Sequence, residues 1–170
     1  SEESSSRFQR RPVQQLFLVC GLDFYVLKIH RPIVLTLLTA LRDIFEDGRP
    51  ADKVIEWHLR NNKKWGSRDR RFFADATYDI VRWWRKLWFT ANSAPEFSDE
   101  NLWEIFSIWY WQRYEKLPTL NGFENLEKNQ RKWAEQLEKS QGNRAIAESI
   151  PDWIDQLGEK YLEHIRSGKY

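Results

Sequence analysis

One stretch, from Trp65 to Trp88, constrains the fold more than any other part of the chain. At 100° per residue, its apolar side chains fall on one broad arc and most of its charged side chains fall opposite, as in an amphipathic helix. Gly66 can break the preceding chain, and the Ser67 hydroxyl is expected to cap the helix. A helix from Ser67 to Thr90 would be roughly 36 Å long, the diameter of a small domain. We therefore expect this helix to be central.

The start of this helix is strongly basic. Between Arg60 and Arg71, six basic residues stand against one acidic residue, which makes a local charge of +5 in a chain whose net charge is +2. Cations in the first turn of a helix are disfavoured by about 0.3–1 kcal/mol each, so a compensating partner is expected. Either these arginines pair with carboxylates of the same domain, as Arg71 would with Asp75, or a polyanion lies across the helix start. Both explanations stay open for each arginine.

The composition limits the class of protein. A length of 170 residues suits one well-buried domain. Trp occurs ten times and aromatic residues make up 15%, so we expect a core built from large rings. Charged residues make up 31%, which argues against a membrane protein. The single cysteine, Cys20, excludes a disulfide framework and a cysteine-based zinc site, and it favours a cytoplasmic location.

The remaining elements follow from helical spacing and from the placement of Pro and Gly. Further helices are expected from Pro32 to before Gly48, from Pro50 to about Asn62, from Asn101 to Tyr114, from Phe123 to Lys139, and after Pro151, the last preceded by a short helix. The segment Asn101–Tyr114, with Ser98 or Asp99 as its cap, is apolar on almost every side. It is either the most buried helix or an adhesive surface. Because no segment alternates at period 2, the predicted fold class is all-α, with five or more helices.

Catalytic and metal-binding patterns are missing from the sequence. The three histidines, His30, His58 and His164, are isolated, and none forms the i, i+4 pair of a zinc helix. Asp75 and Asp79 have arginines at helical spacing, which favours a salt-bridged face over acid–base chemistry. We assign no catalytic residue, no metal ligand and no cofactor to this chain, which resembles a binding module.

Aromatic and basic residues alternate in KKWGSRDRRFF and RWWRKLW. Such a pattern can combine phosphate pairing with base stacking. Most of these rings belong to the apolar arc, so only Trp65, Phe72 and Trp88 are candidate stacking platforms.

Two stretches of the sequence resemble a known family. The run from Arg31 to Leu87 contains Ala-Asp-Lys at 51–53 and Gly-Ser-x-Asp-Arg at 66–70, and it resembles the NusB-like N-terminal domain of RsmB/Sun-type rRNA cytosine-5 methyltransferases. The segment from Ser149 to Leu162, with its Ser-x-Pro-x-Trp pattern, resembles the lead-in from that domain to the catalytic portion. The hallmark positions in this chain are Asp52, Ser67, Asp69 and Arg70.

The resemblance implies an RNA-binding helical domain that docks 16S rRNA for methylation by a downstream, S-adenosylmethionine-dependent domain. We expect residues 1–27 to be an N-terminal extension or tag, partly disordered, residues 28–141 to be the NusB-like domain, and residues 142–170 to lead into a methyltransferase domain that is absent from this chain. Expected partners are rRNA and that catalytic domain, without a membrane, in a bacterial cytoplasm. Arg70 is expected to be structural because it belongs to the hallmark.

Eight basic residues are the candidates for phosphate contact. The first group is Arg60, Lys63, Lys64, Arg68 and Arg71, and the second group is Arg82, Arg85 and Lys86. Two alternatives remain open at this point. The chain could be a stand-alone NusB-like RNA-binding transcription factor, or it could be a helical protein-interaction module that docks a partner with its Trp-rich helix, Asn101–Tyr114.

Overall fold

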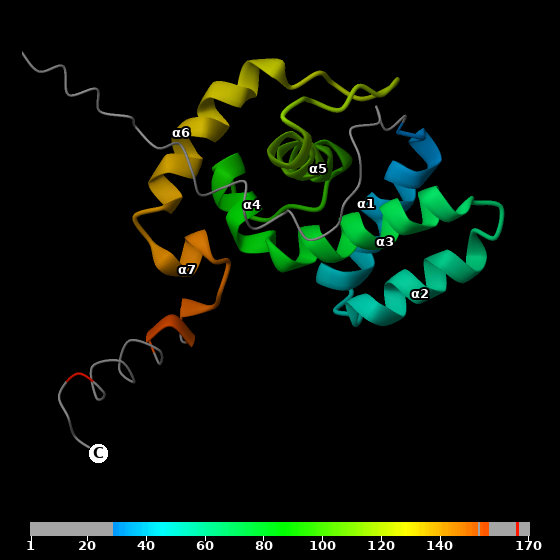
Figure 1. Cartoon of the computed structure of the whole chain (residues 1–170), viewed down its shortest axis with the longest axis horizontal. Coiled ribbons are helices and arrows are strands. Elements are labelled where there is room, and N and C mark those ends of the chain that lie inside the picture. Colours follow the sequence, from blue (N-terminus) through cyan, green and yellow to red (C-terminus); the bar gives the residue numbers. More distant parts are fainter. Residues whose placement is uncertain (1–28, 153, 157–165, 167–170) are drawn as a thin grey trace, which may run out of the picture.

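A computed structural model describes residues 29–152, 154–156 and 166 of the chain. These residues form seven α-helices and one 3-10 helix, and no β-strand occurs among them, so the predicted all-α fold class is confirmed. In chain order the helices are α1 (Arg31–Phe45), α2 (Ala51–Asn61), α3 (Ser67–Arg82), α4 (Trp84–Ala91), α5 (Asp99–Tyr114), η1 (Glu127–Asn129), α6 (Gln130–Ser140) and α7 (Arg144–Ala147) (Figure 1). The expected extension at 1–27, with Cys20, and much of the expected lead-in, with His164, lie outside the described residues.

Helices α1 and α2 form a pair that packs against α3. Pro32 lies in the first turn of α1, where its missing N–H costs no helical hydrogen bond. The apolar face of α1, which includes Val34, Leu37 and Leu41, is buried. Gly48 has a φ of +67°, a left-handed conformation that favours glycine and lets the chain turn back into α2.

The single helix expected from Ser67 to Thr90 is wrong, because the structure has two helices separated at Trp83 (φ −101°, ψ 16°). Figure 1 shows α4 turning away from the line of α3. The break has a reason in packing, since α3 packs against α1 and α2, whereas α4 packs against α5 and α6. A straight helix would present its apolar face to only one of these groups. The expected Ser67 cap is also wrong, because Gly66 is the N-cap and no side chain accepts a capping hydrogen bond there.

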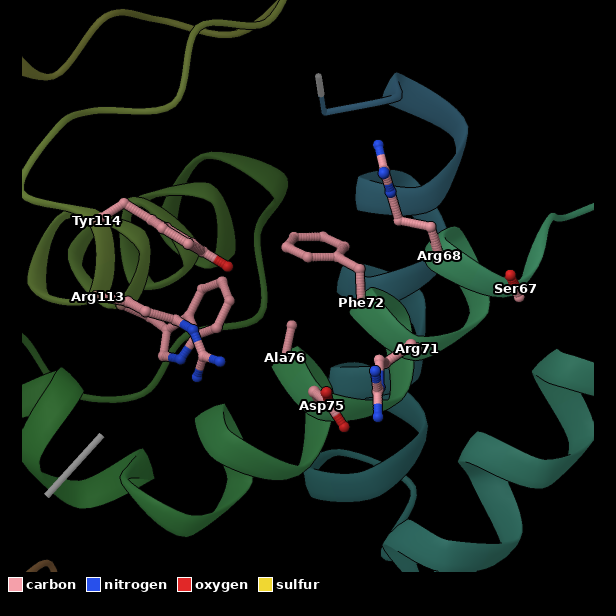
Figure 2. A pocket seen from close by; sticks show the side chains of 9 residues that line it. Ser67, Arg68, Arg71, Phe72, Asp75, Ala76, Arg113 and Tyr114 are labelled. Carbon is pink, nitrogen blue, oxygen red and sulfur yellow. The ribbon is translucent and has the colours of Figure 1, made fainter. Parts of the chain in front are cut away.

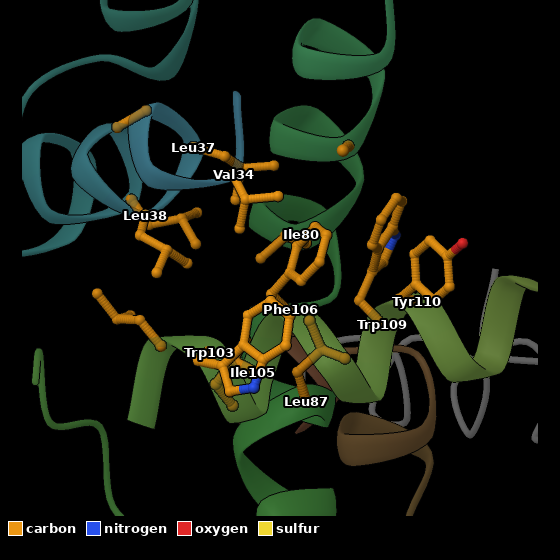
Figure 3. Close-up of a cluster of buried hydrophobic side chains, with 14 of the residues drawn as sticks. Val34, Leu37, Leu38, Ile80, Leu87, Trp103, Ile105, Phe106, Trp109 and Tyr110 are labelled. Atoms are coloured by element: carbon orange, nitrogen blue, oxygen red, sulfur yellow. The ribbon is translucent and has the colours of Figure 1, made fainter. Parts of the chain in front are cut away.

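Helix α5 is the centre of the domain, in place of the α3–α4 segment that we expected. Its axis points nearly along the view in Figure 1, and α1, α3, α4 and α6 lie around it. Figure 3 shows its large side chains, among them Phe106, against apolar residues of α1, α3 and α4. Ser98 caps α5 as predicted, accepting a hydrogen bond from the Asn101 N–H at 3.2 Å. Of the two readings of this helix, the most buried helix is therefore the correct one.

Helices α6 and α7 pack on α4, and α6 also contacts α5. The helix expected from Phe123 to Lys139 begins later, with η1 leading into α6. Trp133 of α6 is fully buried, and its indole N–H donates to Glu104 Oε1 at 2.9 Å, which fixes α6 to α5. After α7, Asp152 and residues 154–156 are helical. No helix in the described part of the chain combines the length and the apolar character that crossing a membrane requires.

Candidate nucleic-acid interface

Five exposed basic residues of the first candidate group lie at the junction of α2 and α3, and we call this region the α2–α3 basic surface. Arg60 lies in the last turn of α2, Lys63 and Lys64 lie in the turn that follows, and Arg68 and Arg71 lie in the first two turns of α3. All five are exposed. Arg60 pairs with Glu56, one turn earlier. Within the described part of the chain, the other four have no ion-pair partner.

The expected pairing of Arg71 with Asp75 is therefore not found. Asp79, which was expected to reach Arg82, instead accepts from the Trp109 indole N–H at 2.8 Å and pairs with Arg113 at 3.4 Å. Asp69 is the acidic residue in the first turn of α3, and it forms no ion pair with these arginines in the described part of the chain. The positive end of the helix dipole and the free arginines consequently add to one another at this surface.

Arg70 holds the turn beneath the basic surface. Its Nη1 donates to the carbonyl oxygens of Leu59 at 2.9 Å and of Asn62 at 3.4 Å, at the end of α2. The Asn62 carbonyl also accepts from the Trp65 N–H at 3.1 Å. The Trp65 ring packs on Phe73, with 5.2 Å between the ring centroids. These contacts keep Lys63 and Lys64 on a fixed turn between two helices. The hallmark residues around them differ in setting, since Asp52 and Ser67 are exposed, whereas Asp69 is half-buried in the first turn of α3.

The second candidate group lies at the opposite end of α3 and on α4. Eleven residues of helix separate Arg71 from Arg82, which corresponds to roughly 16 Å. Arg82 Nη1 donates to the Glu148 carbonyl at 2.9 Å, and Arg85 donates to the Ile150 carbonyl at 2.5 Å and to Asp152 Oδ1 at 2.6 Å. These two side chains are thus bound to the segment that follows α7.

Lys86 belongs to the same contact with the C-terminal segment. Its backbone N–H donates to Ser149 Oγ at 3.4 Å, and its ammonium nitrogen lies 5.3 Å from the centroid of the Trp83 ring. Burial lowers the pKa of Lys86, and the neighbouring Glu148 opposes that shift. The structure therefore does not bring the eight candidate cations onto one surface.

A pocket of about 350 Å³ opens beside the basic surface, between α3 and the C-terminal part of α5 (Figure 2). Three aromatic side chains, Phe72, Trp109 and Tyr114, form its apolar walls, and Phe72 and Tyr114 point toward each other from the two helices. Its charged lining consists of Arg68, Arg71, Asp75 and Arg113. Sequence reasoning missed this pocket, because Arg113 and Tyr114 come from a helix far along the chain.

The pocket combines aromatic walls with a lining in which positive charges outnumber negative ones. Burial raises the pKa of the Tyr114 hydroxyl, and Arg113 opposes that shift. The hydroxyl therefore stays protonated at neutral pH and can donate a hydrogen bond. Asp79 holds the Arg113 side chain at 3.4 Å, so this guanidinium is positioned before any ligand enters.

Of the three expected stacking platforms, two are inaccessible to a base on the outer surface. Trp88 of α4 is buried in the core, and Phe72 is buried except where it lines the pocket. Trp65 is half-buried against Phe73. The exposed ring near the basic surface is Trp57, which is 51% exposed and has the Arg49 guanidinium 6.0 Å from its centroid. A helical projection of α2 could have found it, since Val54, Ile55 and His58 define a buried face that excludes position 57.

Most rings of the Trp-rich helix, and His58 among the histidines, have structural settings. Trp103, Phe106 and Trp109 of α5 are at most 3% exposed, whereas Trp111 and Tyr114 near its end are partly buried. His58 is buried, and its Nε2 lies 3.0 Å from Asp43 Oδ2. In the described part of the chain, no three His, Cys, Asp or Glu side chains are grouped so that they could hold a metal ion.

No protein-family model, no curated protein and no solved structure matches this chain. The fold and the site define a class of protein, an all-helical domain. In it, two helices and the turn between them carry exposed cations beside an aromatic pocket.

Proposed function

We propose that this chain is an RNA-docking domain, the NusB-like N-terminal part of a bacterial, cytoplasmic 16S rRNA cytosine-5 methyltransferase. The observation that carries the proposal is the α2–α3 basic surface, where four exposed cations without a described ion-pair partner lie in the turn that Arg70 holds and at the start of α3. Unpaired cations on a fixed surface suit a polyanion, because binding releases the counterions of the phosphates without new ordering of the protein.

The family assignment within this proposal depends on the sequence pattern. The Ala-Asp-Lys and Gly-Ser-x-Asp-Arg patterns lie at the starts of α2 and α3, and Arg70 of the second pattern ties the two helices together. The Ser149–Leu162 pattern favours a methyltransferase parent over a stand-alone transcription factor. In the full-length methyltransferase, a downstream domain would bind S-adenosylmethionine and methylate the cytosine. The present chain would contribute RNA binding.

The test is a fluorescence-anisotropy titration of the chain with a 16S rRNA hairpin and with polyglutamate, at low and moderate salt. The hairpin should bind more tightly than polyglutamate, and its affinity should fall with salt along a slope of several phosphate contacts. Replacing Lys63 and Lys64 with Ala should reduce the magnitude of that slope by about 1.4–1.8, the value for two contacts.

A matched control removes the same charge elsewhere. Lys128→Ala with Lys132→Ala also deletes two exposed lysines, at η1 and α6, on the other side of the domain. This variant should keep the wild-type slope. Absence of binding at low salt, or an equal loss in both double variants, would contradict the proposal.

A further inference from the structure

We propose that the pocket between α3 and α5 binds a single unpaired nucleobase of the docked RNA. The inference rests on the proposed function and deepens it, because it assigns the pocket the part of recognition that reads unpaired RNA. Its observations are separate from those of the basic surface. They are an aromatic cavity of about 350 Å³, one fixed cation and one carboxylate inside it, and two free arginines at its mouth.

The walls of the pocket match the faces of a base. Phe72 of α3 and Tyr114 of α5 point toward each other across the cavity, as Figure 2 shows, and Trp109 also lines it. Side chains of this kind offer π-faces on which any base can stack, and RNA-binding proteins commonly hold splayed-out bases in this way. A fully paired base remains in its helical stack and would not reach between these rings.

The polar lining matches the edge of a base. The Arg113 guanidinium, held by Asp79, offers N–H donors to a base carbonyl, and the Asp75 carboxylate offers acceptors to ring or amino N–H groups. Asp75 forms no ion pair with any described residue, so its oxygens are free for this purpose. Guanine carries two adjacent N–H donors beside a carbonyl on one edge, so it can engage both oxygens of the Asp75 carboxylate and a donor of Arg113 at once.

The rim joins the pocket to the basic surface. Arg68 and Arg71 line the pocket and also belong to the α2–α3 basic surface, and both are exposed. A strand whose phosphates lie on that surface would therefore carry the ribose of its next nucleotide to the mouth of the pocket. A free aromatic metabolite would not use the lysines of the turn, which is why we favour a base within a chain of phosphates.

The experiment compares two RNA hairpins that differ at one position, an unpaired guanosine in one and an abasic residue in the other. Anisotropy titrations at low salt should show that the wild-type protein binds the guanosine hairpin about tenfold more tightly. Tyr114→Ala should reduce this ratio to nearly one, while Lys63→Ala with Lys64→Ala should weaken both hairpins equally and leave the ratio unchanged.

Two further variants separate loss of base binding from loss of folding. Tyr78→Ala removes an exposed tyrosine of α3 outside the pocket lining and should preserve the ratio. Asp75→Asn keeps the side-chain volume and should lower the ratio, so it provides the test if Tyr114→Ala does not fold by circular dichroism. Equal wild-type binding of the two hairpins would overturn this inference alone. Failure of both hairpins to bind would overturn the proposed function and this inference with it.

Discussion

The two ends of the α3–α4 segment carry similar numbers of basic residues in opposite settings. At the first end, Arg68 and Arg71 are exposed and meet no acidic partner in the described part of the chain. At the other end, Arg82 and Arg85 donate to the carbonyl oxygens of Glu148 and Ile150. The second setting has a clear physical cause, because the segment after α7 presents carbonyl groups, and cations are favoured near the C-terminal end of a helix.

The difference shows that a run of basic residues does not by itself reveal whether the residues bind a ligand or stabilise the fold. Their neighbours in the structure decide this. Arg82 and Arg85 hold the segment after α7 by hydrogen bonds to its backbone carbonyls, and Lys86 is half-buried beside them. We therefore expect the exposed arginines of the first end to govern RNA affinity. The arginines that donate to backbone carbonyls, Arg70 at the first end and Arg85 at the second, should govern stability. Three variants test this division, and they are given from the largest expected effect to the smallest.

The largest effect is expected at Arg70, inside the RNA-binding end. Arg70→Gln removes the charged donor from the carbonyls of Leu59 and Asn62, and hydrogen bonds from charged groups contribute about 1.5–3 kcal/mol. Urea denaturation should show a loss of this size in the free energy of unfolding. The neighbouring Arg71→Gln is the matched control, since its side chain is exposed, and it should change stability by about 0.5 kcal/mol or less while it weakens RNA binding. Equal stability of the two variants would contradict the role of Arg70.

A smaller loss of stability is expected at the other end. Arg85→Ala removes the donor to the Ile150 carbonyl and the pair with Asp152, whose carboxylate is largely exposed. Because solvent screens that pair, the expected cost is about 1 kcal/mol, mostly from the carbonyl contact. RNA affinity should match the wild type in anisotropy titrations. A loss of affinity as large as that of Lys63→Ala would place Arg85 on the RNA surface instead.

The smallest effect concerns the pH dependence of stability through Lys86. Its folded-state pKa is lowered by burial from the ordinary 10.5, against the opposing Glu148. Below the folded-state pKa, both states hold the proton and the folded state carries the full desolvation cost, and this cost disappears as pH rises toward 10.5. The free energy of unfolding of the wild type should therefore rise with pH relative to that of Lys86→Met.

The control for this measurement is Lys132→Met, which alters an exposed lysine of α6. Its difference in unfolding free energy from the wild type should stay constant over the same pH range in urea titrations. A constant difference for Lys86→Met as well would show that Lys86 is hydrated like a surface lysine.

Much of the fold was predictable because local patterns decide it. Pro32 and Pro50 mark the starts of α1 and α2 within one residue, and Ser98 caps α5 as predicted. The break at Trp83 was not predictable, since the apolar arc continues through it and only the separate partners of α3 and α4 require it. The central position of α5 could not be predicted either. A helix that is apolar on almost every side can be buried in the core or exposed as a binding surface, and the sequence pattern is the same in both cases.

The sequence by itself determined the all-helical class, the aromatic core and the concentration of charge between Arg60 and Arg71, because these depend on composition and on spacing along the chain. Only the tertiary structure decided which cations stay free, which are bound by the C-terminal segment, and that Arg113 and Tyr114 meet Phe72 around a pocket. The physical reason is that hydrogen bonds, ion pairs and cavities depend on distances between residues far apart in the chain, and no local pattern records those distances.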